Sequence, residues 1–211
     1  MDDTDPKALI TPDEILIAEF EYIAQSAFQA NEDRARVASF YALSVSSLVA
    51  AILGAKFLGE EFDLQYVYLA FAGLFLFLTA LGALTIAQLA RLRVAWREAA
   101  KAMNQIKEYY ISRSPRLEDA FAWRTNTTLP ETDKKYSIAN LMATEVALLG
   151  AITFGAAFFC LLLGLDTQVL LGLLVSVIFG AGGCFALLIW YRRLLAWHQD
   201  SSSPKKSAGE K

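Results

Sequence analysis

Four long runs of apolar residues restrict the possible folds of this sequence more than any other feature. The runs extend over 37–58, 66–90, 141–165 and 169–191. A helix of about 20 residues crosses a hydrocarbon core of about 30 Å, because each residue adds about 1.5 Å. Hydrophobic residues make up 55% of the 211-residue chain, and soluble domains seldom contain four such runs. The sequence therefore predicts four membrane-spanning helices rather than core helices of a soluble protein.

The second run leads without interruption into a polar helix. No charged residue occurs over 66–87, whereas charged side chains are frequent from Arg91 onward. Neither Gly nor Pro lies between Ala83 and Ser114, so we expect one helix over 64–113. Beyond the membrane its apolar residues recur in steps of three and four, which is typical of a coiled-coil seam. The seam consists of Leu92, Trp96, Ala99, Met103, Ile106 and Tyr110.

An amphipathic helix is expected before the first run. Thr11, Pro12 and Glu14 have the pattern of a capping box with proline at the first helical position. The apolar stripe of this helix consists of Leu16, Phe20, Ile23, Ala27 and Ala30. The helix is mainly acidic and the stalk, residues 91–113, is mainly basic. Because both stripes need burial, we expect them to pair antiparallel; the alternative is two unrelated helices with solvated charges.

The distribution of basic residues predicts the orientation in the membrane. Of the 19 lysine and arginine residues, 18 lie before residue 37, within 91–137 or after residue 191, and the remaining one is Lys56. Under the positive-inside rule these three segments are cytoplasmic, so both termini are expected in the cytoplasm. The start of the sequence lacks a basic n-region, and we therefore expect no cleavable signal peptide.

Together these features predict an all-α integral membrane protein, a four-helix transmembrane bundle with a cytoplasmic helical stalk. The expected regions are a cytoplasmic amphipathic helix (1–36), a transmembrane hairpin of spans 1 and 2 (37–90), a cytoplasmic stalk and connector (91–137), a transmembrane hairpin of spans 3 and 4 (138–191) and a largely disordered cytoplasmic tail (192–211). Within the connector, a short helical piece is expected around 117–124.

Small residues recur at every fourth position in three of the spans, a pattern that lets helices approach closely in lipid. Whether the helix packed against each face belongs to the same chain or to another copy is left open by the spacing. The faces are Ser46, Ala50 and Gly54 with Ser47, Ala51 and Ala55 in span 1, Ala143, Ala147, Ala151 and Gly155 in span 3, and Ser176, Gly180 and Cys184 in span 4.

The sequence contains few groups able to perform catalysis. Glu145 is the one carboxylate inside a span and forms, with Gln88, a candidate intramembrane polar site. We favour a structural polar contact of Glu145 over an ion or proton site. His198 is the only histidine, and Cys160 and Cys184 are expected too far apart in depth for a disulfide, so we expect no metal site and no cofactor.

The layout of residues 11–113, to which Arg34, Arg36 and Trp96 contribute, resembles that of the small bacterial SLATT-type membrane proteins. The resemblance covers about half of the chain, and spans 3 and 4 depart from the two-span pattern of that family. It implies a pore-forming effector of a nucleotide-triggered conflict system.

Two hypotheses for function follow. The first is a non-enzymatic, multi-pass protein of the inner (plasma) membrane that self-associates as a scaffold or regulatory subunit. The alternative is a pore-forming channel or effector in which the serines of span 1 line the pore. The expected partners are the lipid bilayer and further copies of the chain. An unidentified membrane or cytoplasmic protein is also left open, whereas nucleic acid is not expected, because the basic stalk has an acidic helix to pair with.

Replacing Trp96 with Ala should destabilise the stalk far more than the charge reversal Glu19→Lys. Loss of a buried Trp ring costs about 3–5 kcal/mol, whereas an exposed ion pair contributes about 0–1 kcal/mol. The unfolding temperature of each variant, measured by thermal unfolding, gives the comparison. Disulfide crosslinking of cysteines placed at Ala27 and Trp96, without the native cysteines, tests the pairing. If these positions and their neighbours never crosslink while stalks crosslink to one another, the seam serves oligomerisation instead.

Overall fold

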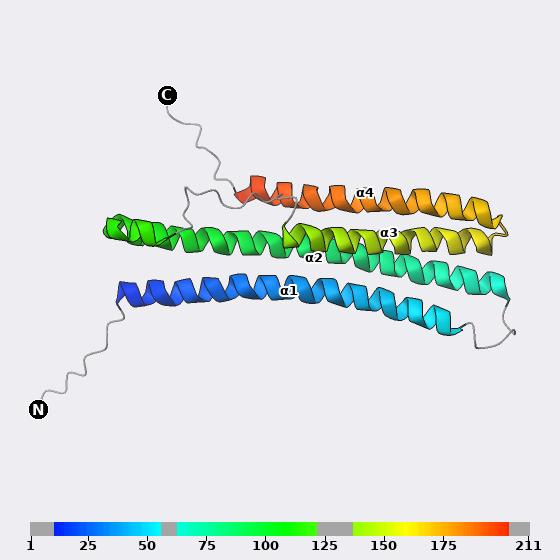
Figure 1. The fold of residues 1–211 in the computed structure, drawn as a ribbon, viewed down its shortest axis with the longest axis horizontal. Helices are drawn as coiled ribbons and strands as arrows, with labels where there is room; N and C mark the ends of the chain where they lie inside the picture. Colours follow the sequence, from blue (N-terminus) through cyan, green and yellow to red (C-terminus); the bar gives the residue numbers. More distant parts are fainter. Residues whose placement is uncertain (1–10, 56–62, 122–136, 203–211) are drawn as a thin grey trace, which may run out of the picture. The chain divides into compact units, whose positions relative to one another are not determined.

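The computed structural model describes residues 11–55, 63–121 and 137–202, and this part of the chain is helical without strands. The helices are α1 (Pro12–Ala55), α2 (Leu64–Arg113), the 3-10 helix η1 (Pro115–Ala120), α3 (Ile138–Gly164) and α4 (Val169–Ser202), as Figure 1 shows. The prediction of a single helix over 64–113 is confirmed. The short connector helix was expected at 117–124 but is found at Pro115–Ala120, and residues 122–136 lie outside the described part.

The helix ends follow from local side-chain chemistry. At the start of α1, the Thr11 amide donates to Glu14 Oε2 at 2.8 Å and the Glu14 amide donates to Thr11 Oγ1 at 3.3 Å. This reciprocal pair confirms the predicted capping box. The start of α2 is capped by the Asp63 carboxylate, which accepts from the Gln65 amide at 3.0 Å. Helix α2 ends at Arg113, where the Ser114-Pro115 pair prevents continuation.

A tight turn joins α3 to α4. The Thr167 amide donates to the Leu162 carbonyl oxygen at 3.1 Å, and the Asp166 amide donates to the Leu163 carbonyl oxygen at 3.1 Å. Asp166 has φ 57°, the left-handed conformation that this type of helix ending requires. Aspartate tolerates that conformation better than most residues, because its short polar side chain can form local hydrogen bonds.

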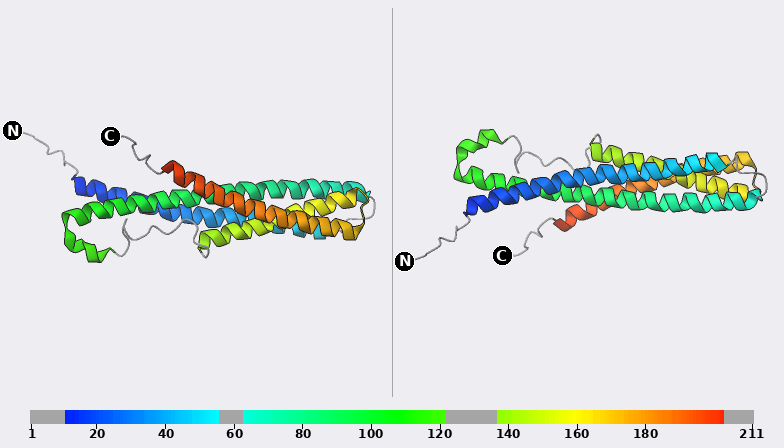
Figure 2. Two further views of the ribbon diagram at one scale, coloured as in Figure 1. Left: turned by 90° about the horizontal axis from the view of Figure 1, so that it is seen from above. Right: turned by 90° about the horizontal axis from the view of Figure 1, so that it is seen from below.

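The chain forms two compact units. Unit 1 comprises residues 1–32 and 95–131, and unit 2 comprises residues 33–94 and 132–211. In unit 2 the parts of the four long helices run alternately in opposite directions (Figure 2). All four helices contribute to its core, which consists of Ala38, Tyr41, Val45, Leu78, Ile86, Leu89, Ala90, Ala143, Val146, Ala147, Tyr191 and Leu195.

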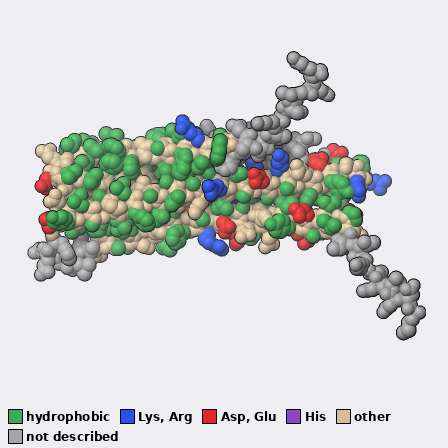
Figure 3. Space-filling model, turned by 180° about the vertical axis from the view of Figure 1, so that it is seen from behind, with side chains coloured by type: hydrophobic (Ala, Val, Ile, Leu, Met, Phe, Trp, Pro, Cys, Tyr) green, Lys and Arg blue, Asp and Glu red, His purple; other side chains and the backbone are tan. Residues whose placement is uncertain are grey.

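The outer surface of unit 2 is strongly apolar. Large side chains such as Phe40, Leu170, Ile178 and Phe185 are 68–70% exposed. Figure 3 shows hydrophobic side chains spread along the whole visible face of this unit, with few charged side chains away from its ends. An apolar surface of this extent is unfavourable in water and is typical of contact with lipid. The described residues include four helices long and apolar enough to cross a membrane, as predicted, which indicates a multi-pass membrane protein.

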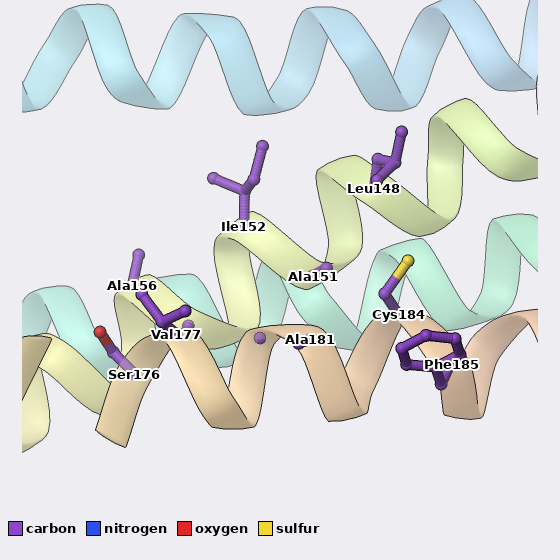
Figure 4. A pocket seen from close by; sticks show the side chains of 11 residues that line it. Leu148, Ala151, Ile152, Ala156, Ser176, Val177, Ala181, Cys184 and Phe185 are labelled. Atoms are coloured by element: carbon purple, nitrogen blue, oxygen red, sulfur yellow. The ribbon is translucent and has the colours of Figure 1, made fainter. Parts of the chain in front are cut away.

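Helices α3 and α4 approach closely through their small residues. A Cβ atom at Gly155 would lie 2.9 Å from the Ser176 carbonyl oxygen, and one at Gly180 would lie 3.0 Å from the Ala151 carbonyl oxygen. Figure 4 shows the pocket beside this contact, which is lined by Ala151 and Ile152 of α3 and by Ser176 of α4; Ile152 projects away from α4. The small-residue faces of spans 3 and 4 therefore pack on each other within one chain. The spacing in the sequence had left the partner of each face open.

Substitution of Gly155 by Ala should destabilise the α3–α4 pair by about 1–3 kcal/mol, because the new methyl group meets backbone rather than a flexible side chain. Gly182→Ala is the matched control, since a Cβ atom at Gly182 meets nothing within 4 Å. This control should be neutral or stabilising, because Ala favours helix more than Gly does. Unfolding in mixed detergent micelles measures both variants, and equal effects would contradict the close backbone contact.

Candidate functional site

In unit 1 the burial of side chains follows the predicted apolar stripes. Leu16, Phe20 and Ile23 are half-buried and Ala27 is 6% exposed, whereas Tyr22 is 69% exposed. The stalk seam is likewise half-buried at Leu92, Trp96, Met103, Ile106 and Tyr110, of which all but Leu92 belong to unit 1. This pattern agrees with two stripes that share one compact unit. The residue-by-residue pairing of the stripes stays a prediction.

The candidate intramembrane polar site is not joined by a hydrogen bond. Glu145 on α3 and Gln88 on α2 are both exposed. Among the described residues, no hydrogen bond links Glu145 to Gln88, Asn140 or Arg91. Gln88 instead lines a groove between α1 and α2. The structural role favoured for Glu145 stays a prediction.

The arginines that the structure describes in unit 2 lie on α1, α2 and α4, toward the same end of the unit. This set, named here the arginine belt, consists of Arg34, Arg36, Arg91, Arg93, Arg192 and Arg193. Neighbouring helices of this unit run in opposite directions (Figure 2). Arg93 of α2 and Tyr191 of α4, the neighbour of Arg192, both lie close enough to Arg34 of α1 to influence its charge. Asp63 and Asp166 lie at the opposite end. The sequence predicted the orientation from these arginines, whereas the proximity of Arg34 to Arg93 and Tyr191 comes from the structure.

Two arginines of the belt are buried. Arg34 is 6% exposed and Arg93 is 8% exposed. Arg34 lies before the apolar run that starts at Val37, and burial lowers the pKa of its guanidinium, while the nearby charge of Arg93 lowers this pKa further. The Tyr191 side chain, which is 3% exposed, raises the pKa of Arg34. The belt therefore combines buried and exposed positive charge at one level of the unit.

A cluster of hydroxyl groups lies in the apolar part of unit 2. The oxygen atoms of Thr79 and Thr153 are 3.1 Å apart, and each hydroxyl also lies within hydrogen-bond distance of a carbonyl oxygen in its own helix. Each has one hydrogen, so one hydroxyl donates across the helices and the other donates to its own backbone. The Tyr41 hydroxyl lies close to Thr153 but lacks the geometry of a hydrogen bond. Tyr41 itself is 1% exposed.

The small-residue face of α1 differs from those of α3 and α4, because it is exposed. This surface, named here the α1 face, consists of Ser46, Ser47, Ala50, Ala51 and Gly54, and all five residues are exposed. A Cβ atom at Gly54 would meet nothing within 4 Å. The Ser46 hydroxyl donates to the Ala42 carbonyl oxygen at 2.9 Å, within its own helix. The sequence identified these residues, but only the structure shows that they face outward.

Metal-binding and cysteine residues are a further possible source of chemistry in the part of the chain that the structure describes. Within this part, no three His, Cys, Asp or Glu residues are grouped closely enough to hold a metal ion. Cys160 and Cys184 are free thiols. The side chain of His198 lies outside the described residues.

No family model, curated protein or solved structure matches this chain. The residues of unit 2 therefore provide the strongest basis for a functional proposal. Two features stand out among them: the exposed α1 face and the arginine belt.

Two substitutions in the hydroxyl cluster should have different effects on stability. Tyr41→Phe removes a hydroxyl that lacks a hydrogen-bond partner, so stability should be unchanged or slightly higher. Thr153→Val removes a hydrogen bond between helices and should cost about 0.6–1.7 kcal/mol, the usual range within membranes. The free energy of unfolding in mixed detergent micelles is measured for both variants and for the unmodified protein. A loss for Tyr41→Phe equal to that for Thr153→Val would show that the tyrosine hydroxyl has a stabilising partner, such as a buried water.

Proposed function

We propose that this protein is a non-enzymatic, multi-pass membrane protein that self-associates through the α1 face and acts as a scaffold or regulatory subunit. The observation that carries the proposal is the exposure of Ser46, Ser47, Ala50, Ala51 and Gly54 on a helix suited to cross the membrane. Within one chain, the equivalent faces of α3 and α4 are covered by each other.

The physical reason is the nature of helix association in lipid. Lipid chains are as apolar as leucine, so helices associate through close van der Waals contact and hydrogen bonds rather than through the hydrophobic effect. Small side chains allow that close contact, whereas large side chains such as Ile178 and Leu170 pack equally well against lipid. Ser46 uses its hydrogen within its own helix but retains acceptor capacity for a neighbouring helix.

The proposed location is the inner (plasma) membrane, with both termini and the stalk in the cytoplasm. The arginine belt supports this orientation, because cytoplasmic segments carry an excess of basic residues. Unit 1 then lies on the cytoplasmic side and is available to a protein partner, either a second copy or an unidentified regulatory target. Such a partner would add to, or rearrange, the packing of the half-buried seam residues Trp96, Met103 and Ile106.

The second candidate function is a pore, which the serines of α1 favour. In addition to the α1 face, Ser39 is exposed on the same helix. In a single copy these serines lie outside the core of unit 2, so a conduit requires several copies with their α1 helices turned toward a common axis. The resemblance of residues 11–113 to SLATT-type proteins agrees with this candidate.

Cysteines at Ala50 should crosslink two copies on oxidation in membranes, after both native cysteines are replaced. The α1 face brings equivalent positions close together in the assembled protein. The matched control is a cysteine at Ile178, which is 69% exposed on α4. Ala50→Leu should shift the protein from oligomer to monomer in native mass measurements in mild detergent. A monomer at every concentration, or equal crosslinking at Ile178, would contradict the proposal.

Recordings in planar bilayers separate the scaffold from the pore. If the protein forms a pore, conductance should appear and fall by at least tenfold in Ser47→Leu, because a bulky apolar side chain would narrow the conduit and repel water. If oligomers form but conduct under no trigger tested, the scaffold remains and the pore is rejected.

A further inference from the structure

A groove between α1 and α2 descends from the arginine belt into the apolar part of unit 2. Its volume is about 400 Å³, within the range of about 300–1,000 Å³ that ligand pockets occupy. The two helices run in opposite directions, and a Cβ atom at Gly82 would lie 2.5 Å from the Tyr41 hydroxyl oxygen. This contact fixes the relative level of the two helices. It places Arg36 beside Gln88, and Ser44 near Leu81.

The lining of the groove changes from charged to apolar along its length. Arg36 and Gln88 lie at the belt end, and Phe40, Leu81 and Leu84 lie toward the middle of the unit. A molecule that fits this gradient has an anionic group at one end and a hydrocarbon chain at the other. Its long axis lies parallel to the helices.

The belt end of the groove has hydrogen-bond donors available for an anion. The Arg36 side chain is 77% exposed, and its ion pair with Asp33 is long, at 3.7 Å. Exposed ion pairs of this kind contribute little and exchange readily. Gln88 makes no hydrogen bond to another described residue. By contrast, the hydroxyls of Ser44 and Thr85 donate to backbone oxygens of their own helices, at 2.8 and 2.9 Å.

From this arrangement we infer that the groove binds an anionic phospholipid. The phosphate of the headgroup accepts hydrogen bonds from Arg36 and Gln88, and one acyl chain occupies the space between Phe40 and Leu84. The other arginines of the belt add positive potential at the same level, which favours an anionic headgroup over a zwitterionic one. The groove lies within a single copy of the chain, so the inference is independent of self-association.

A lipid explains the lining better than a free phosphate ion does. A free ion would use only the belt end and would leave the apolar part of the groove without a ligand. The groove also opens on the outer surface of unit 2, where exposed Phe40 and Leu84 would contact lipid in any case. One anionic lipid therefore binds in the groove with selectivity over the lipids of the bulk bilayer.

Native mass spectrometry of the full-length protein tests the inference, with phosphatidylglycerol and phosphatidylcholine of identical acyl chains as probes. We expect one phosphatidylglycerol to bind more tightly than phosphatidylcholine. Arg36→Gln should weaken its binding about fivefold, the equivalent of about 1 kcal/mol for one basic residue at an anionic membrane surface. The matched control is Arg192→Gln, which removes an exposed arginine of the same belt that does not line the groove. The control should weaken binding less than Arg36→Gln does, because Arg192 does not line the groove and acts on the headgroup only through longer-range potential.

A second variant tests the acyl-chain part of the groove without changing the charge. Ser44→Phe places a bulky ring in the groove and should weaken phosphatidylglycerol binding as much as Arg36→Gln does. Inorganic phosphate at millimolar concentration should not displace the lipid. The inference is overturned if the two lipids bind equally, if Arg192→Gln weakens binding as much as Arg36→Gln, if Ser44→Phe binds normally, or if free phosphate competes.

Discussion

The lack of water in the hydrocarbon core determines most of this structure. Each backbone amide and carbonyl that enters the core must be satisfied without water, so a long helix is the simplest solution. Charged side chains are costly in the same region. The described part of unit 2 follows both requirements: its helices are continuous, its arginines lie at one end, and Asp63 and Asp166 lie at the other. Glu145 is the exception to the second requirement, because it is a charged residue within the apolar run 141–165.

Continuity of the helices was the most predictable property. The absence of Gly and Pro after Ala83 predicted that α2 would continue to Arg113, and the pattern at Thr11 and Glu14 predicted the start of α1. Both follow from local rules that act within a few residues. The connector was harder to predict, because the 3-10 helix at Pro115–Ala120 depends on a weak preference of a short segment.

The role of each small-residue face could not be predicted from its spacing. The faces containing Ala50, Gly155 and Gly180 have the same pattern in the sequence, yet only the last two are covered within one chain. Spacing gives the rotation of a residue about its own helix axis, whereas exposure depends on which helices are neighbours. For the same reason, the sequence suggested a contact between Glu145 and Gln88, but the structure does not join them by a hydrogen bond and places Gln88 in the groove next to Arg36.

The tight turn around Asp166 has a consequence for biogenesis. Only four residues separate the last residue of α3 from the first residue of α4, and the turn is closed by hydrogen bonds from the Asp166 and Thr167 amides. Two apolar helices joined so closely can enter a bilayer together as a hairpin. If the termini are cytoplasmic, as proposed, Asp166 is the one charge within residues 165–168 that crosses with the turn. Once it has crossed, the ionised side chain resists return through the hydrocarbon core. In that orientation Asp166 would oppose the return of the inserted hairpin through the bilayer.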